Sequence, residues 1–494
     1  MSLARAVAWN TAVQVGGRAV GLIASIAFNA LLVRHLGIAT YGQFVAASTY
    51  VGMFMILGEA GLYLVAVRRA MQEPERREQI LGTAFGLRLL WTLLPLSLAY
   101  VVAQLIPEEH FPNYDRTVKT AIAILALNEY LRLICQFLTA VFRMHLRMEL
   151  AVIGEVGSRV VALVGIVVVA NRGGGLLSAA GALVAANGLN LLYQWAMSRR
   201  LERFRPQLHR TLAREIAREA IVVAGVLIMS LLRTQVGVFL LSLLRPAEDV
   251  GIYGVAIKVH EVVITFPAMF SAVLFPVLSR LASEDHAKLR RIFQRSFDVM
   301  ALAGVGLAVT LMVVAPQFAR ILGEPRATTP MRLLATTLPT VFVSMSFAQL
   351  VLAVGRHAVL LRLYTVLATA TFVANMLLIP HFSYRTIPIV SIAIEAFLLL
   401  GLALYWTRWR GLTLRLRAVW CVPIGAVVCV TIIGGAHTWL EPAAATIPQR
   451  LLIAALAGAV TLGVYVAIVT RLRLVEPEVL RALLPGKRQA TPTT

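Results

Sequence analysis

Three arginines lie inside long apolar stretches of this sequence without an acidic residue nearby. Arg18 and Arg233 are near the middle of the first and seventh stretches and Arg88 is in the third, and none has a carboxylate three or four positions away. An ionisable group at mid-bilayer costs about 2.5–3.5 kcal/mol on insertion scales and usually faces a bundle interior or a wet cavity. Because a guanidinium binds phosphate through a planar, bidentate fork, these residues predict an anion-binding central cavity.

Other charges within the apolar stretches have an opposite charge one helical turn away. Such spacing puts both members of a pair on one helix face, where they can neutralise each other. The predicted pairs are Glu129 with Arg132, Glu155 with Arg159, and Lys258 with Glu261. A neutralised pair can still line a pathway, and we include Lys258 with Arg18, Arg88 and Arg233 among the candidate cavity residues.

Several carboxylates are candidates for coupling transport to a proton or sodium ion. Glu59, Glu129 and Glu395 lie in or beside apolar stretches, and an intramembrane carboxylate is a functional candidate by default. Pairing with an arginine from another segment is the alternative, for example Glu59 with Arg18 or Arg88. Asp298 lies near a segment boundary, and we expect it to be solvated.

The sequence contains no recognisable motif for enzyme catalysis. We find no nucleotide-binding loop, no Asp-x-Asp metal motif and no nucleophile elbow, and the nearest approach to a metal cluster, Glu108-Glu109-His110, is typical of a solvated loop. The three cysteines lie in apolar runs without paired spacing, so we expect buried thiols rather than disulfides or metal ligands. We predict no catalytic residue, metal or cofactor.

The elements that position these residues follow from composition. The chain has 494 residues, of which 59% are hydrophobic and 14% are charged, whereas soluble domains carry about 25% charge. Disorder requires low hydrophobicity and high charge, so a membrane protein is the class that remains. Since a span needs about 20 apolar residues, the chain has room for many spans and for no large soluble catalytic domain.

The apolar stretches predict an all-α polytopic membrane protein with about 14 transmembrane helices. Helices are required because an isolated strand would leave backbone groups unpaired in lipid. The predicted spans are residues 8–33, 42–67, 81–104, 118–141, 151–170, 177–197, 219–243, 251–278, 297–315, 331–354, 359–379, 387–406, 419–439 and 450–470.

The distribution of basic residues predicts the orientation. With 46 Lys and Arg against 24 Asp and Glu, the net charge is +22, and a nucleic-acid partner is less consistent with this composition than a membrane. About 30 of the 46 basic residues fall in alternate connections, which the positive-inside rule places on the cytoplasmic side. We therefore expect a multi-pass protein of the bacterial cytoplasmic (inner) membrane with both termini cytoplasmic. Its most basic connection, residues 198–218, is expected to be an amphipathic helix on the inner leaflet that contacts anionic lipid.

Two junctions share one pattern and indicate an internal repeat. Arg34 precedes Tyr41-Gly42 after the first span, and Arg245 precedes Tyr253-Gly254 after the seventh. Parallel repeats with a substrate path at their interface are common in transporters. The predicted organisation is a six-helix bundle (1–197), a basic cytoplasmic linker (198–218), a second six-helix bundle related by a pseudo-two-fold axis (219–406), two additional helices (407–470) and a cytoplasmic tail (471–494).

The order of several short motifs is specific enough to suggest a family. They are Arg34-x-Leu36-Gly37-x3-Tyr41-Gly42-x-Phe44, Gly58-Glu59-Ala60-Gly61-Leu62, Arg68-Arg69, Gly251–Lys258, Leu274–Arg280, Gly355-Arg356 and Asn375…Ile379-Pro380. In this order they resemble the polysaccharide transporters of the multidrug/oligosaccharidyl-lipid/polysaccharide (MOP) flippase superfamily, in particular the O-antigen-type lipid-linked oligosaccharide flippases. The chain departs from the family pattern at His381–Pro388, where a glycine-rich restart is usual.

The resemblance implies a cationic central cavity bordered by spans 1 and 7, which agrees with the charge argument. A pyrophosphate-linked sugar head cannot cross hydrocarbon without desolvating its charges and hydroxyls. We therefore expect a flippase that moves an undecaprenyl-pyrophosphate-linked oligosaccharide, an O-antigen or exopolysaccharide repeat unit, by alternating access. The alternatives are a lipid II (peptidoglycan precursor) flippase, a multidrug/cation antiporter and, outside this class, a membrane glycan polymerase or ligase. Fourteen predicted spans, together with arginines that have no carboxylate three or four positions away in the sequence, argue against the antiporter. Short connections argue against the enzymes.

Overall fold

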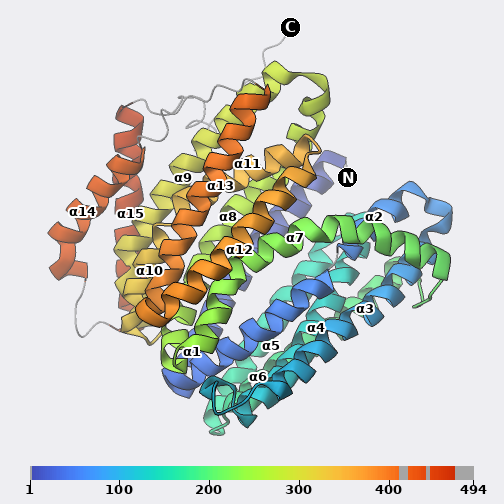
Figure 1. Ribbon diagram of the computed structural model, residues 1–494, viewed down its shortest axis with the longest axis horizontal. Helices are drawn as coiled ribbons and strands as arrows, with labels where there is room; N and C mark the ends of the chain where they lie inside the picture. Colours follow the sequence, from blue (N-terminus) through green and yellow to red (C-terminus); the bar gives the residue numbers. More distant parts are fainter. Residues whose placement is uncertain (1–2, 60, 411–420, 441–445, 473–494) are drawn as a thin grey trace. The chain divides into compact units, whose positions relative to one another are not determined.

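The computed structural model describes residues 3–59, 61–410, 421–440 and 446–472, and throughout these residues the protein is helical without β-strands (Figure 1). The α-helices are α1 (Leu3–Glu59), α2 (Leu62–Gln72), α3 (Arg77–Leu105), α4 (Arg116–Met144), α5 (Met148–Asn171), α6 (Leu176–Leu201), α7 (Arg210–Leu244), α8 (Ala247–Glu284), α9 (His286–Ile321), α10 (Thr328–Ala335), α11 (Leu338–Ala353), α12 (His357–Phe382), α13 (Thr386–Arg410), α14 (Cys421–Leu440) and α15 (Ile447–Arg471). Short 3-10 helices are η1 (Pro74–Arg76), η2 (Pro112–Tyr114), η3 (Pro325–Ala327) and η4 (Ser383–Arg385).

The helices are long and apolar enough for a polytopic membrane protein, as predicted. Among the described residues, nine pass this test, or ten if the bent pair Pro325–Ala335 and Leu338–Ala353 forms one span. The predicted apolar segments largely coincide with helices where the chain is described. The all-α membrane class is thus confirmed, and the number of 14 spans stays a prediction.

The chain forms two compact units. The first unit comprises residues 1–258, 322–324 and 364–387, and the second comprises residues 259–321, 325–363 and 388–494. Helices α8 and α12 therefore contribute to both units. The predicted bundle boundaries at residues 197 and 219 stay a prediction.

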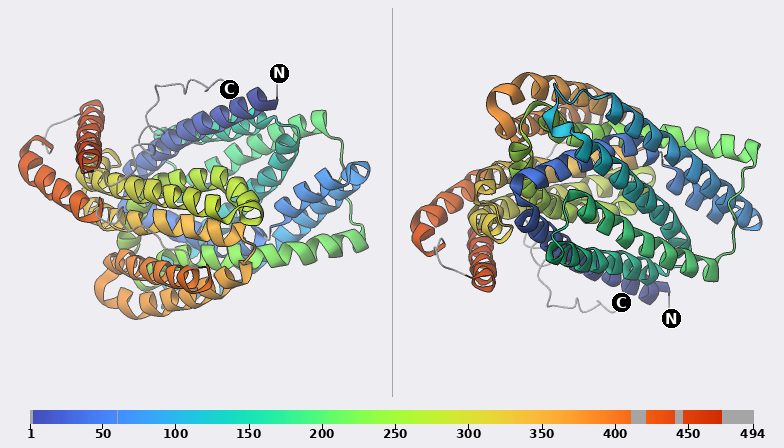
Figure 2. Two further views of the ribbon diagram at one scale, coloured as in Figure 1. Left: turned by 90° about the horizontal axis from the view of Figure 1, so that it is seen from above. Right: turned by 90° about the horizontal axis from the view of Figure 1, so that it is seen from below.

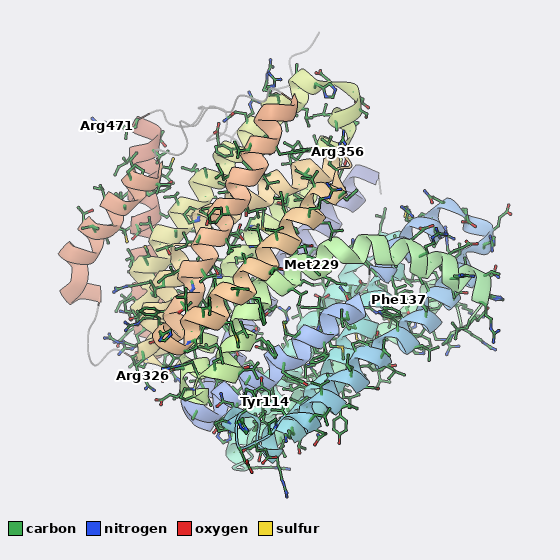
Figure 3. All side chains as sticks on the ribbon, viewed as in Figure 1. Tyr114, Phe137, Met229, Arg326, Arg356 and Arg471 are labelled. Carbon is green, nitrogen blue, oxygen red and sulfur yellow. The ribbon has the colours of Figure 1, made fainter. Side chains whose placement is uncertain are left out.

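In the first unit, α3, α4, α5 and α6 run side by side (Figures 1 and 2). Their apolar core includes Phe85, Phe137 and Phe204, and Figure 3 labels Phe137 among these helices. The two spans predicted at 8–33 and 42–67 meet within α1, which is interrupted at Gly37. Gly37 has φ 76° and ψ 164°, a backbone conformation that a residue with a Cβ adopts only at a cost.

The two repeated Tyr-Gly junctions meet in the first unit. A Cβ on Gly42 of α1 would lie 1.7 Å from the carbonyl oxygen of Ala247, and one on Gly251 would lie 2.3 Å from the carbonyl oxygen of Ile38. The start of α8 therefore crosses α1 with backbone against backbone. Small residues permit such close crossings in membrane proteins.

The basic connection 198–218 is only in part the amphipathic helix that we predicted. Residues 202–209 have no regular secondary structure, and they lie along α3 where Gly82 and Gly86 leave room. The backbone N–H of Gln207 donates to the carbonyl of Gly82 at 3.0 Å, and a Cβ on Gly86 would lie 2.4 Å from the Gln207 carbonyl oxygen. Helix α7 begins at Arg210, so residues 210–218 of the predicted linker are the first part of α7.

In the second unit, α9 lies between α11 and the α14–α15 pair (Figures 1 and 2). Tyr465 of α15 is fully buried against α9, where its hydroxyl donates to the Leu302 carbonyl at 3.2 Å. Asp298 of α9 is only 9% exposed and accepts a hydrogen bond from Gln294 at 2.9 Å. Our expectation that Asp298 is solvated was wrong, because α9 is enclosed on several sides.

Candidate functional site

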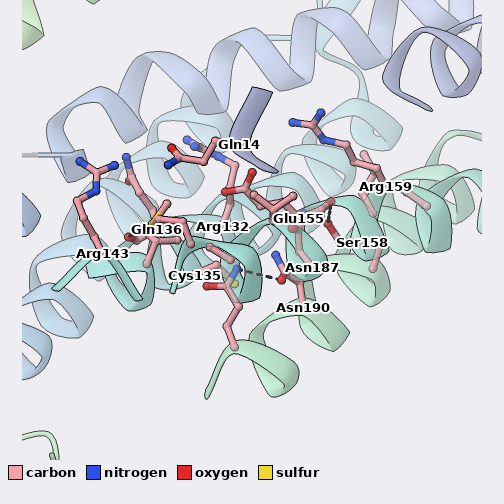
Figure 4. Close-up of a pocket in the computed structure, with 18 of the residues that line it drawn as sticks. Gln14, Arg132, Cys135, Gln136, Arg143, Glu155, Ser158, Arg159, Asn187 and Asn190 are labelled. Carbon is pink, nitrogen blue, oxygen red and sulfur yellow. Dashed lines mark hydrogen bonds between the residues drawn. The ribbon is translucent and has the colours of Figure 1, made fainter. Parts of the chain in front are cut away.

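A polar pocket lies inside the first unit, between the faces of α1, α2, α4, α5 and α6 (Figure 4). Its volume is about 480 Å³. Figure 4 shows Gln14, Arg132 and Glu155 near its middle, with Arg143 and Arg159 toward opposite ends. Three arginines and one carboxylate line it, so the described part of the wall is cationic.

The pocket is polar because three successive helices direct a polar stripe toward it. On α4, the residues at positions 132, 136, 139 and 143 recur every three or four positions and share one face. On α6, Asn187, Asn190 and Gln194 do the same. At the pocket, Arg132, Arg143 and Glu155 are exposed, whereas Thr139, Asn190 and Gln194 are buried. A polar face of this kind within an apolar bundle is typical of a cavity.

The amide groups on α6 are partly satisfied by one another. Asn187 donates to Oδ1 of Asn128 at 2.8 Å, and Gln194 donates to Oδ1 of Asn190 at 3.0 Å. Gln194 is fully buried, yet its Oε1 has no hydrogen-bond donor within the described part of the chain. A buried acceptor without a donor costs about 1–3 kcal/mol. The pocket wall therefore contains an unsatisfied acceptor, which lies beneath the accessible surface in this structure.

The arginines of the pocket are held differently. Nε of Arg132 donates to Glu129 at 2.6 Å, which confirms the predicted pair. The guanidinium of Arg143 lies 5.3 Å from the centre of the Tyr63 ring, a distance suited to a cation–π contact. The predicted pair of Glu155 with Arg159 does not form among the residues described, because Arg159 extends toward α1 instead.

Glycines let Arg159 and its helix approach α1. A Cβ on Gly21 would lie 2.0 Å from Nη1 of Arg159, and one on Gly17 would lie 2.0 Å from Cγ1 of Val152. Gly17 and Gly21 are four residues apart and therefore form one small-residue face on α1. Across the pocket, a Cβ on Gly154 would lie 2.5 Å from Oδ1 of Asn190. Small residues thus allow α5 to pack closely against both α1 and α6.

Arg88, a predicted cavity residue, is buried behind this pocket. It is 1% exposed, and its guanidinium donates to the carbonyl of Gly58 at 2.7 Å and to Oε1 of Gln136 at 3.1 Å. A longer bond of 3.4 Å reaches the carbonyl of Leu133. Because Gln136 lines the pocket, Arg88 supports the wall through a neighbour and ties α3 to α1 and α4.

The other predicted cavity cations lie on different helices. Arg18 is in α1, but its side chain is outside the described residues, as is that of Glu59. Arg233 of α7 lies with its guanidinium 5.6 Å from the centre of the Tyr364 ring of α12, within the first unit. Lys258 is half-buried on α8.

The remaining acids are placed as follows. Glu129 is half-buried beside the pocket and pairs with Arg132. Glu395 of α13 is 3% exposed in the second unit. Glu108, from the predicted solvated loop, forms an ion pair with Lys119 at 3.1 Å. Glu129 therefore belongs to the first unit and Glu395 to the second, and neither unit contains both residues.

Sequence reasoning missed the pocket although a signal was present. We treated Arg132 and Arg159 as internally neutralised and searched for isolated cations. A search for polar residues that recur at helical spacing on consecutive spans would have found the faces of α4, α5 and α6. The close approach of these helices, however, depends on glycine contacts between segments far apart in sequence.

Comparisons with known proteins agree with the fold. The sequence profile described as "Polysaccharide biosynthesis protein" matches residues 3–282. No curated protein sequence matches the chain significantly. A structure titled "Lipid II flippase MurJ, inward closed conformation" is similar with a TM-score of 0.72 and 12% identity, over 94% of this chain and 99% of that one.

Two further solved structures share the architecture. An inward-facing multidrug resistance MATE family transporter of the MOP superfamily has a TM-score of 0.65 and 13% identity, over 81% of this chain and 98% of that one. A MOP superfamily transporter from Pyrococcus furiosus Vc1, described as having a binding pocket of reverse polarity, has a TM-score of 0.61 and 13% identity, over 81% and 95% of the two chains. At these identities the likeness establishes the MOP fold, and the resemblance seen in the sequence motifs is confirmed.

Proposed function

The chain belongs to the polysaccharide biosynthesis protein family, and from that premise we propose that it is a flippase for an undecaprenyl-pyrophosphate-linked oligosaccharide. The substrate is an O-antigen or exopolysaccharide repeat unit, and it crosses the bacterial inner membrane. The protein acts as a transporter rather than an enzyme and needs no cofactor. Both chain termini are cytoplasmic in this proposal.

The pocket chemistry carries the proposal. Arginines and amides share one cavity, and the buried Oε1 of Gln194 has no donor among the described residues. A glycan hydroxyl supplies that donor when the wall opens around Gln194, and a phosphate or sugar acid is attracted by Arg132, Arg143 and Arg159. An apolar or cationic drug satisfies neither requirement, which disfavours the multidrug antiporter.

The same chemistry explains how translocation is accelerated. In hydrocarbon, the sugar hydroxyls and two phosphates would lose their hydrogen bonds to water. A pocket that replaces those bonds lowers the barrier, while the isoprenoid tail remains in lipid. Alternating access then exposes the headgroup first to one side of the membrane and then to the other.

The arginines predicted from sequence keep a place in this proposal. Arg18, Arg233 and Lys258 bind the pyrophosphate during passage, with Arg88 holding the pocket wall through Gln136. Glu59, Glu129 and Glu395 are candidates for binding a coupling proton or sodium ion. Lipid II remains the second candidate substrate. The structure of the lipid II flippase MurJ has the same fold, and a lipid II headgroup also combines sugars with pyrophosphate.

Complementation decides between these substrates. We expect the chain to restore surface glycan in a strain that lacks an oligosaccharide flippase and to leave a strain depleted of the lipid II flippase inviable. Rescue of the second strain alone would overturn the substrate assignment in favour of lipid II. Rescue of neither, with normal membrane levels of the protein, would contradict both.

Variants of the pocket test the site. Arg159→Gln and Gln194→Leu should each lower glycan export at least tenfold at unchanged membrane levels. Arg172→Gln is the matched control, because Arg172 is exposed at the end of α5 and does not line the pocket. Gln194→Leu is the sharper test, since removing a buried unsatisfied acceptor offsets the lost bond to Asn190 and leaves stability unchanged or higher. Wild-type export by both pocket variants would exclude this pocket as the binding site.

A further inference from the structure

The first part of α7 carries three arginines in a row. Arg210, Arg214 and Arg218 are four positions apart, so their side chains lie on one face of the helix. All three are exposed. The row extends about 12 Å along the helix axis at 1.5 Å per residue.

The other faces of this helical part are already occupied. Leu212, Ile216 and Ala220 are buried in the apolar core of the first unit, next to α2 and α3. On the next face, Arg69 of α2 forms ion pairs with both Glu215, at 2.8 Å, and Glu219. The helix is thus fixed on two sides and presents the arginines on the third.

The acids near this row are neutralised by other cations. Glu219 also pairs with Arg68, and Glu202 forms an ion pair with Arg77 at 4.0 Å. Within the described part of the chain, no carboxylate pairs with Arg210, Arg214 or Arg218. Because nearby acids have their own partners, the positive charge of the row stays uncompensated by the protein.

We propose that Arg210, Arg214 and Arg218 form a binding surface for the headgroups of anionic phospholipids. The apolar run of α7 begins at Ala220, so Arg218, Arg214 and Arg210 lie about 3, 9 and 15 Å before it along the helix axis. Arg218 is at headgroup depth, and Arg214 and Arg210 come to this depth when α7 is tilted from the membrane normal, as spanning helices commonly are. The hydrocarbon core is about 30 Å thick and the headgroup layers add about 5–8 Å on each side. Leu208, which is 52% exposed beside the row, suits the same interface.

The connection before α7 makes this surface rigid. Phe204 is buried against Phe85 and Trp195, with ring centres 5.6 and 6.1 Å away, and Gln207 is bonded to Gly82. A fixed row of guanidiniums loses little conformational entropy on binding phosphates, in contrast to a flexible basic tether. This inference concerns lipid rather than cargo and stands independently of the proposed substrate.

The test is a lipid titration of the full-length protein, delipidated in detergent and followed by native mass spectrometry. Phosphatidylglycerol should bind more tightly than phosphatidylcholine, and R210Q/R214Q/R218Q should weaken the first phosphatidylglycerol at least about tenfold, since each basic residue near a membrane surface contributes about fivefold. The matched control R116Q/R172Q/R385Q removes the same charge from three exposed arginines in other connections and should leave binding unchanged. Raising the salt concentration to about 1 M should abolish the preference.

Each other outcome overturns the proposal. Wild-type affinity in the triple variant, or an equal loss in the control variant, would show that the row has no specific role. Displacement of the lipid by millimolar glycerol phosphate would show that the surface binds free phosphate instead. An unchanged melting temperature of R210Q/R214Q/R218Q without lipid confirms that a loss of binding is not a loss of fold, because the variant keeps the apolar and acidic faces of α7.

Discussion

Arg88 shows how a single buried cation can be accommodated between helices. It donates to the carbonyl of Gly58, while the indole of Trp91, one turn later on α3, donates to the carbonyl of Leu57 at 2.9 Å. These carbonyls belong to the last turn of α1, where backbone acceptors have no partner within the helix and positive charge is favourable. Arg88 is therefore a cap for α1 as well as a support for Gln136.

This role predicts a loss of stability before a loss of ligand binding. Arg88→Met should lower the melting temperature and the membrane level of the protein. The carbonyls of Gly58 and Leu133 and the amide of Gln136 would each lose a charged hydrogen-bond donor, and each such bond contributes at most about 1.5–3 kcal/mol to stability. Arg88→Lys should recover part of the loss. A stable Arg88→Met protein that fails only in export would instead support direct contact with the substrate.

The ion pairs between α2 and α7 predict a response to pH. The hydrogen bond from Arg69 lowers the pKa of Glu219, and the same bond together with Glu215 raises that of Arg69. A carboxyl whose pKa is lower in the folded protein stabilises it above the unfolded pKa of about 4.3 and loses this contribution as the pH falls through the folded value.

We therefore expect the melting temperature to fall as the pH drops below about 4.5, and to fall less steeply in Glu219→Gln. Glu284→Gln is the control, because Glu284 forms a more exposed pair with Arg280 at 3.7 Å. An identical acid profile of wild type and Glu219→Gln would show that this pair contributes nothing to stability.

At the scale of elements, glycines decide how closely helices approach. The crossing of α1 and α8 at Gly42 and Gly251 brings two backbones into contact, and α3 accepts the connection before α7 at Gly82 and Gly86. These contacts determine how closely α1 approaches α8 and how closely α3 approaches the connection before α7. Helix propensity alone would favour alanine at each position, so packing overrides it.

Gly42→Ala should separate α1 from α8 at their crossing. The added methyl would collide with the Ala247 carbonyl, at the cost of about 1–3 kcal/mol that extra volume has in a packed contact. Gly52→Ala, on the same helix but with no atom within 4 Å of the added Cβ, should be neutral or stabilising. Thermal unfolding in detergent measures both, and equal melting temperatures would contradict the close crossing.

At the scale of the whole molecule, the bilayer takes the place of water as solvent. Large apolar side chains such as Leu94, Val430 and Ile23 are more than 60% exposed, which is unfavourable in water and ordinary in lipid. The charge distribution adds the orientation, with arginine-rich connections expected on the cytoplasmic side.

Cysteine accessibility tests this orientation. The three native cysteines are buried, so a thiol introduced at an exposed position will dominate labelling. Glu109→Cys should react with a membrane-impermeant maleimide added to intact cells, and Arg200→Cys should react only after the membrane is opened. The reverse pattern would invert the predicted topology.

The sequence by itself determined the class, because composition alone requires a bilayer, and its ordered motifs indicated the family. It also identified the Glu129–Arg132 pair, since residues three apart on a helix must be neighbours. Only the tertiary structure showed that Arg88 caps α1, that Arg159 extends toward Gly21 rather than Glu155, and that α4, α5 and α6 enclose a common pocket. Those facts depend on contacts between helices, whose distances are set by the packing of small residues that are far apart in the sequence.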